Sequence, residues 1–297
     1  MAMRAFLHTY RKALANHADV HTFGEGLKRH GWDVYAGEAS DWRGGELVVQ
    51  WNVRQDGMFE KTRGSAVETC ILETSYLEPR REYVSVSFGQ HVNNRNRFYG
   101  PFDDPSRWEE RFAHLMRPWR SGVGPIVIMG QMPGDMATKN HVNFFDWVLE
   151  TYRAFAACDR IVWFRPHPGM VLPNPKQLDK QSKICVHPDQ DEIWRGWRQA
   201  SKEGLRVHAG PLEKALVEAG RVVTFNSNSG VDAVLAGVPT VAVDKGSMAW
   251  DVTSHELGEI VHPDREKWAH ALAWKQWTRD EIAAGECWAH VCPDSLR

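Results

Sequence analysis

The first half of the sequence alternates short apolar runs with one amphipathic segment. Residues 3–9, 46–51 and 69–74 are apolar runs of strand length, and the alternating run 83–88 is typical of a strand with one buried face. Residues 20–31 carry apolar side chains at helical spacing and end at a glycine, which predicts a helix closed by that glycine. This order of elements predicts an α/β domain.

The second half repeats the alternation more regularly. The expected strands are residues 125–131, 160–168, 206–210, 221–225 and 240–244, and the expected helices are residues 143–157, 212–220 and 230–237. Because strands that alternate with helices are joined by crossovers, this half predicts a parallel sheet. The remaining segment, residues 264–291, has a helical pattern with no strand after it.

A stretch rich in Gly, Pro and charged residues, from about Phe98 to Pro125, separates the two halves and is typical of a linker or hinge. We therefore expect an N-terminal domain over residues 1–120 and a second domain over residues 121–262. The C-terminal helices, residues 263–297, are expected to cap a domain or to pack back on the first one.

Composition narrows the class of protein. The 297 residues are 42% hydrophobic and 25% charged, with a net charge of −2, so bulk charge gives no argument for a strongly cationic nucleic-acid binder. No apolar run approaches the roughly 18 residues that cross a bilayer, and the N-terminus lacks a signal-peptide core, so we expect a cytoplasmic protein. Five scattered cysteines without a CxxC pair favour structural thiols over a disulfide framework or a zinc site.

Small polar residues follow the predicted strand 221–225. Asn226, Ser227, Ser229 and Gly230 stand where a helix is about to begin, and in a parallel sheet such strand ends form the ligand-binding edge. Unpaired N–H groups at the start of a helix, with serine hydroxyls beside them, suit a phosphate. The alternative is that Ser229 is an N-cap and Asn226 a turn former.

Two further strand ends carry similar chemistry. Arg165 and His167 each precede a proline in the sequence RPHP, which ends the expected strand, and an arginine gives bidentate hydrogen bonds to phosphate oxygens. A pairing of Arg165 with an acidic residue at the sheet edge is the alternative. The loop that starts at Gly130 and Gln131 has the glycines that a closely approaching ligand needs.

The RPHP segment, together with the segment from Phe225 to Glu256 that begins FNSNSG, resembles the donor-binding half of GT-B glycosyltransferases, close to the capsule-polysaccharide (Kdo) transferase type. The resemblance covers about residues 125 to 260. The first half also resembles bacteriophage proteins. The resemblance implies two Rossmann-like domains facing a cleft, with the nucleotide sugar on the C-terminal domain and the acceptor on the N-terminal one.

The resemblance also implies a set of donor-binding residues, with a UDP-sugar or a CMP-sugar as the co-substrate. These residues are Gly130, Gln131, Arg165, His167, Asn226, Ser227, Ser229, Gly230, Lys245, Ser247, Met248 and His255. The alternative is that His255 and Glu256 stand at the start of a helix and that Lys245 is a solvated surface charge. The sequence has no GxGxxG run and no DxD motif, so we expect a transferase that is independent of metal and of other cofactors.

Transfer to a hydroxyl needs a base to take its proton. Glu73 directly follows a predicted buried strand and is the first candidate. Asp19, which comes just before the predicted helix, is the second candidate, and the alternative is that it only caps that helix. His17 and His21 flank Asp19 and are further candidates.

Residues 80–97 are the predicted acceptor-binding segment, and they contain four arginines and one glutamate beside aromatic residues. Arg80, Arg95 and Arg97 suit a phosphate backbone and unstacked bases, so a 5-hydroxymethylpyrimidine in bacteriophage DNA is one acceptor, reached by base flipping in the host cytoplasm. A polysaccharide or a small molecule is the alternative. A nucleotide-binding or DNA-binding module without turnover is the alternative from another class.

Overall fold

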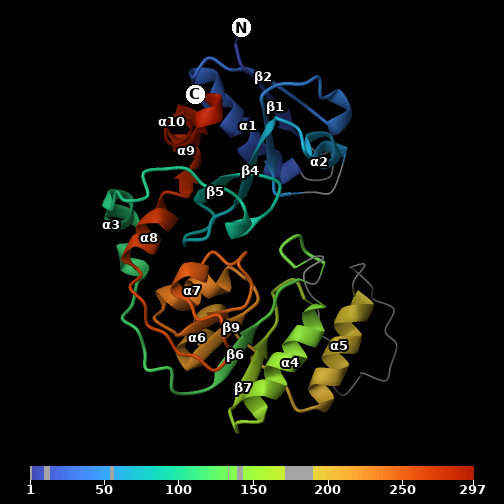
Figure 1. Cartoon of the computed structure of the whole chain (residues 1–297), viewed down its shortest axis with the longest axis vertical. Helices are drawn as coiled ribbons and strands as arrows, with labels where there is room; N and C mark the ends of the chain where they lie inside the picture. The colour runs from blue at the N-terminus through green and yellow to red at the C-terminus, as the bar shows by residue number, and fades with distance from the viewer. Residues whose placement is uncertain (1, 10–13, 54–56, 133, 139–142, 171–189) are drawn as a thin grey trace. The chain divides into compact units, whose positions relative to one another are not determined.

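The computed structural model describes residues 2–9, 14–53, 57–132, 134–138, 143–170 and 190–297. The chain divides into two compact units (Figure 1). Unit 1 contains Met1–His114 and Arg265–Arg297, and unit 2 contains Leu115–Asp264. The sequence places the boundary near residue 120, six residues from the division after His114. No helix in the described part of the chain is long and apolar enough to cross a membrane.

Unit 1 is built on a six-stranded sheet in the order β11-β5-β4-β3-β1-β2. Its strands are β1 (Arg4–His8), β2 (Asp33–Gly37), β3 (Leu47–Trp51), β4 (Glu68–Thr74), β5 (Tyr83–Phe88) and β11 (Gln276–Thr278). The first four run parallel, whereas β5 is antiparallel to β4 and β11 is antiparallel to β5. The sheet is therefore mixed.

The expectation of a tail without a strand is wrong. Helix α8 (Glu266–Ala273) is followed by β11, in which Trp277 pairs with Val84 of β5, and then by α9 (Arg279–Ala284) and α10 (Glu286–Val291). Gly285 separates the last two helices with φ near 80°, a left-handed conformation that favours glycine.

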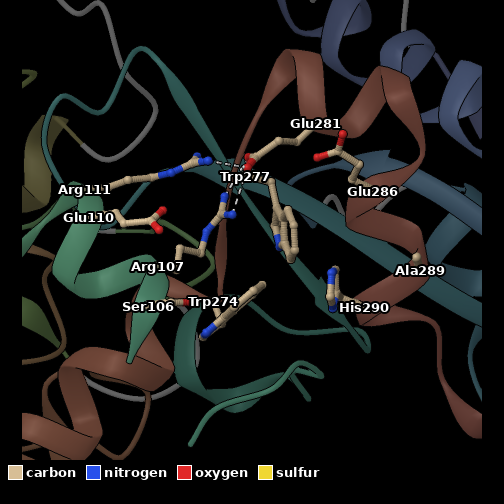
Figure 2. Close-up of a pocket in the computed structure, with 10 residues that line it drawn as sticks. All are labelled: Ser106, Arg107, Glu110, Arg111, Trp274, Trp277, Glu281, Glu286, Ala289 and His290. Atoms are coloured by element: carbon tan, nitrogen blue, oxygen red, sulfur yellow. Dashed lines mark hydrogen bonds and ion pairs between the residues drawn. The ribbon is translucent and has the colours of Figure 1, made fainter. Parts of the chain in front are cut away.

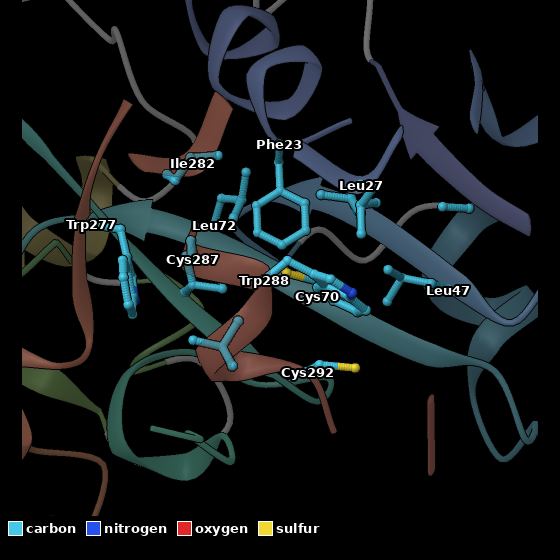
Figure 3. Packing of buried hydrophobic residues seen from close by; sticks show 14 of the residues in the cluster. Phe23, Leu27, Leu47, Cys70, Leu72, Trp277, Ile282, Cys287, Trp288 and Cys292 are labelled. Carbon is cyan, nitrogen blue, oxygen red and sulfur yellow. The ribbon is translucent and has the colours of Figure 1, made fainter. Parts of the chain in front are cut away.

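The main core of unit 1 lies between the sheet and the helices α1 (Leu14–Arg29), α9 and α10. Figure 3 shows Phe23 and Leu27 of α1 packed with Leu72 of the sheet and Trp288 of the C-terminal segment. Three cysteines, Cys70, Cys287 and Cys292, lie in this cluster as free thiols, and burial raises the pKa of each. The last 33 residues thus complete the core that the first 114 begin.

The other face of this sheet carries a smaller cluster. Because side chains alternate along a strand, Phe6 and Val48 point away from the main core and pack with Met58 of α2 (Gly57–Thr62). The chain leaves the sheet after β5 through α3 (Ser106–Arg111).

Unit 2 has a five-stranded parallel sheet in the order β10-β9-β6-β7-β8, as the alternation predicts. The strands are β6 (Ile126–Met129), β7 (Val162–Arg165), β8 (Arg206–Val207), β9 (Arg221–Thr224) and β10 (Thr240–Ala242). The helices are α4 (Phe144–Ala156), α5 (Gln190–Lys202), α6 (Leu212–Glu218) and α7 (Ser229–Leu235).

Both faces of the sheet in unit 2 are buried, which explains why its strands are continuous apolar runs. Ile126 and Ile128 belong to the cluster that includes α4 and Trp197 of α5, whereas Val127 and Met129 belong to the cluster that includes α6 and α7. The strand order reverses between β6 and β9, because the chain builds β7 and β8 on one side and β9 and β10 on the other. Ligands of open α/β sheets bind at such a point.

Candidate functional site

The loops at the switch point of unit 2 are joined by two buried amides. Gln131, just after β6, donates from Nε2 to Oδ1 of Asn226 at 2.7 Å, and the backbone N–H of Asn226 donates to Oε1 of Gln131 at 3.0 Å. Their side chains are only 6% and 1% exposed, respectively. The paired amides hold the ends of β6 and β9 in fixed relation.

Asn226 also reaches the loop after β10. Its Nδ2 donates to Oδ1 of Asp244 at 2.8 Å and to the carbonyl of Ala137 at 2.7 Å, and the same Asp244 oxygen accepts the N–H of Gly246. Because both amide hydrogens of Asn226 are engaged, this side chain organises the loops rather than offering a group to a ligand.

The serines beside Asn226 are partly exposed and hydrogen-bonded to each other, Oγ of Ser229 to Oγ of Ser227 at 2.9 Å. Gly230 is buried, and a Cβ on it would lie 3.0 Å from the methyl group of Thr224. Close packing of α7 on β9 therefore accounts for this glycine.

Arg165 and His167 lie at the end of β7, next to β6. Burial lowers the pKa of Arg165 while Glu213 and Asp232 raise it, and Nε of Arg165 is buried with no acceptor among the described residues. Burial and the charge of Arg165 also lower the pKa of His167, against Asp135, which raises it. The N–H of Gly169 donates to Nδ1 of His167 at 3.0 Å, so neutral His167 carries its proton on Nε2.

Gly130 has a role in bringing these strand ends together. A Cβ at this position would lie 2.8 Å from the carbonyl oxygen of Arg165 and 2.8 Å from the backbone nitrogen of His167. Its own N–H donates to the carbonyl of Arg165 at 2.7 Å. Any larger residue would push the two loops apart.

The remaining donor candidates differ in exposure. Ser247 and Met248 are buried, at 0% and 3% exposed. Lys245 is exposed, as is His255, whose ring stacks on Trp250 with centroids 3.5 Å apart. Oγ of Ser247 accepts the N–H of Ala249 at 3.2 Å, a contact within the loop after β10.

Unit 1 has its own switch point, between β1 and β3, and the sequence analysis missed the residues there. His8 ends β1, and its Nδ1 lies 3.3 Å from Oε1 of Gln50 in β3. Both side chains are buried. Each is a polar residue at or near the end of a buried apolar strand, and this is the signal that could have identified them.

Glu73 lies near the end of β4. Because Gln50 pairs with Ile71, and residues two apart along a strand share a face, Glu73 lies on the same face of the sheet as Gln50 and its neighbour His8. Oε2 of Glu73 accepts hydrogen bonds from the hydroxyl of Tyr76 at 3.0 Å and from the N–H of Asn93 at 3.1 Å. Tyr76 is fully buried, and burial together with the charge of Glu73 raises its pKa well above the usual value. The tyrosine is therefore a permanent donor that orients the carboxylate.

Asp19 lies inside α1 and not before it, because the helix begins at Leu14. Its carboxylate is buried and accepts two hydrogen bonds from Arg279 of α9, at 2.6 and 3.2 Å. This ion pair ties α1 to the C-terminal segment. His21 is exposed, and the side chain of His17 lies outside the described residues.

Arg80 and Arg97, two of the predicted acceptor-binding residues, face acidic side chains. Arg80 lies 3.2 Å from Glu78, and Arg97 lies 2.7 Å from Glu68. Arg95 is exposed at the end of a short 3-10 helix. No cluster of three or more His, Cys, Asp or Glu side chains suited to a metal ion occurs in the described parts of the chain.

No family model matches the sequence, and no curated protein sequence matches it. Solved structures do match. A beta Kdo 2,4 transferase, KpsC of Thermosulfurimonas dismutans, has a TM-score of 0.54 at 13% identity, over 91% of this chain and 90% of that chain. A beta Kdo 2,7 transferase, also KpsC of that organism, has a TM-score of 0.53 at 13% identity, over 96% and 98%. The fold is the GT-B type, with two Rossmann-like domains.

Proposed function

We propose that this chain transfers a sugar from a nucleotide-sugar donor to a hydroxyl group. The observation that carries the proposal is Arg165 at the ligand-binding edge of a Rossmann-like sheet, where its buried Nε has no acceptor among the residues that the structure describes. Two structures of the same fold belong to beta Kdo transferases, which supports glycosyl transfer over other uses of the fold.

Donor binding is assigned to unit 2. The guanidinium of Arg165 would donate charge-assisted hydrogen bonds to the phosphate of the nucleotide, which becomes more negative as the glycosidic bond to the leaving group breaks. Neutral His167 would donate from Nε2 in the same region, and Gln131 and Asn226 would hold the loops in place. Both UDP-sugars and CMP-sugars carry a phosphate that could accept these hydrogen bonds.

Proton removal is assigned to Glu73 in unit 1. Its carboxylate is half-buried near the end of a parallel strand and is oriented by Tyr76 and by the backbone of Asn93. A fixed carboxylate takes the proton from the acceptor hydroxyl as that oxygen attacks the anomeric carbon. Asp19, with both oxygens on Arg279, is the weaker candidate.

We favour a saccharide hydroxyl as the acceptor over a base in DNA. The DNA reading depends on arginines that can neutralise phosphates, and Arg80 and Arg97 already face Glu78 and Glu68. The affinity for a DNA acceptor would fall steeply as the salt concentration rises, whereas the affinity for a saccharide acceptor would not.

The decisive experiment incubates the protein with a panel of UDP-sugars and CMP-sugars, together with oligosaccharides or hydroxymethylated DNA, and identifies products by mass spectrometry. Arg165→Ala should lower kcat/KM about 10²-fold, the usual cost of one transition-state donor. Arg206→Ala, an exposed arginine of the same sheet, is the matched control and should leave the rate unchanged. Nucleotide binding without release of nucleotide from any sugar would identify a binding module instead.

A further inference from the structure

The loop after β10 holds a stack of two rings that the chemistry proposed above does not use. The imidazole of His255 lies parallel to the indole of Trp250, with ring centroids 3.5 Å apart and 6° between the planes. Nε2 of His255 lies 3.0 Å from the carbonyl oxygen of Trp250. Because a carbonyl oxygen only accepts, this nitrogen donates, and the hydrogen bond fixes the orientation of the imidazole.

One face of the imidazole is accessible to a ligand. Trp250 covers the other face, and no second ring stacks on His255 within the described parts of the chain. His255 is exposed, whereas Trp250 is half-buried. Since one face lies on the indole and the residue is nonetheless exposed, its accessible surface belongs to the opposite face and to the edge of the ring. The stack therefore presents a flat aromatic surface to solvent.

The stack lies at the ligand-binding edge of the sheet in unit 2. Ser254 forms a parallel bridge with Val241 of β10, so the next residue, His255, lies beside the end of that strand. Two backbone hydrogen bonds fix this position. The N–H of Ser254 donates to the carbonyl of Thr240 at 3.0 Å, and the carbonyl of Ser254 accepts from the N–H of Ala242 at 3.0 Å. The aromatic surface is thus held in place before a ligand arrives.

The stack and Arg165 both lie close to the first turn of α7. A Cβ on Gly230, the second residue of that helix, would lie 3.9 Å from Cβ of Ala249, and Trp250 is the residue after Ala249. On the other side, the charge of Asp232, also in the first turn of α7, raises the pKa of Arg165. A nucleotide whose phosphate is bound by Arg165 therefore has its base in the region of the stack.

We infer that the open face of His255 binds the nucleobase of the donor by stacking, an inference that rests on the proposed function and names the residue that holds the base. Every nucleobase has a flat π face, and stacking on an aromatic ring uses that face and not the edge of the base. Uracil and cytosine therefore both fit, in keeping with either donor. Trp250 supports the imidazole from behind, so the base meets a surface that does not turn away.

The test measures the affinity of the full chain for UMP, for CMP and for dihydro-UMP, whose saturated ring is no longer flat, by calorimetry. The unchanged protein should prefer UMP to dihydro-UMP about tenfold, and His255→Ala should remove that preference and weaken UMP and CMP about tenfold. His255→Phe, which keeps an aromatic ring, should retain both. His262→Ala is the matched control, because His262 is an exposed histidine of the same unit that lies against Trp119 and contacts the carbonyl of Arg120.

Equal nucleotide affinities of His255→Ala and the unchanged protein, with Arg165→Ala weakened, would overturn the inference and leave donor binding in place. A lower unfolding free energy of His255→Ala with the preference for UMP intact would also overturn it, because the stack would then only shield Trp250 from water. Base binding that depends on His255, without transfer from any nucleotide sugar, would retain the inference and remove the proposed function. No binding of either nucleotide would overturn both.

Discussion

Single residues at the ligand-binding edge of unit 2 have two distinct tasks. Arg165 presents a donor that finds no acceptor in the described part of the chain, whereas Gln131 and Asn226 use their amides on each other and on neighbouring loops. The sequence pattern found all three, since a polar residue after a buried strand is conspicuous. It did not separate the tasks, because hydrogen bonds between loops far apart in the chain leave no local signal.

Gly130 gives a prediction at this scale. Gly130→Ala should destabilise unit 2 by about 1–3 kcal/mol, because its Cβ would lie 2.8 Å from backbone atoms of Arg165 and His167 that cannot move aside cheaply. Nucleotide affinity should fall with it. Gly258→Ala is the matched control, since a Cβ there meets nothing within 4 Å. Urea unfolding and calorimetry measure both effects, and equal stability of the two variants would contradict the packing role.

The strands that the sequence predicts well are those buried on both faces, such as β6 and β9, because continuous apolar runs are informative on their own. Strand β11 was missed for a physical reason. It has three residues between two helices, and its pairing partner, β5, lies about 190 residues earlier in the chain. The burial of Ser247 and Met248 in the loop after β10 was not foreseen either, because it depends on packing that no local pattern encodes.

Glu281 of α9 forms ion pairs with Arg107 and Arg111 of α3 (Figure 2), and this contact is expected to depend on pH. Burial raises the pKa of Glu281, but hydrogen bonds from Arg107 and from the N–H of Thr278, with the charges of Arg107 and Arg111, outweigh it and set the pKa to about 2. The depressed pKa means that the carboxylate stabilises the fold at pH above 4.5, its ordinary value, and that this contribution is lost as pH falls towards about 2.

Glu281→Gln should therefore destabilise unit 1 by about 3–5 kcal/mol at pH 7, because it leaves the buried guanidinium of Arg107 without its partner. The difference in unfolding free energy between the variant and the unchanged protein should shrink between pH 4.5 and about 2. Glu286→Gln, an exposed carboxylate on the next helix, should show neither effect. Urea unfolding as a function of pH measures the difference, and a constant difference across that range would remove the ion pair as its source.

At the scale of the whole molecule, the two units differ in how the chain builds them. Unit 2 is one continuous segment, Leu115–Asp264, with its own sheet and two buried layers. Unit 1 is discontinuous, because β11 completes its sheet and Trp277 and Trp288 of the last 33 residues fill its core. In this chain, a continuous unit 2 is therefore inserted between the two segments that together form unit 1.

This difference predicts unequal behaviour of fragments. A fragment of residues 115–264 should fold alone and bind a nucleotide diphosphate or monophosphate, since Arg165, His167 and the loops joined by Asn226 all belong to it. A fragment of residues 1–114 should not fold, because without β11 and α10 it exposes Phe23 and Leu72. Adding a peptide of residues 265–297 should restore its structure. Circular dichroism and calorimetry with UDP and CMP test both halves, and a folded 1–114 fragment, or a folded 115–264 fragment that binds neither nucleotide, would contradict the corresponding expectation.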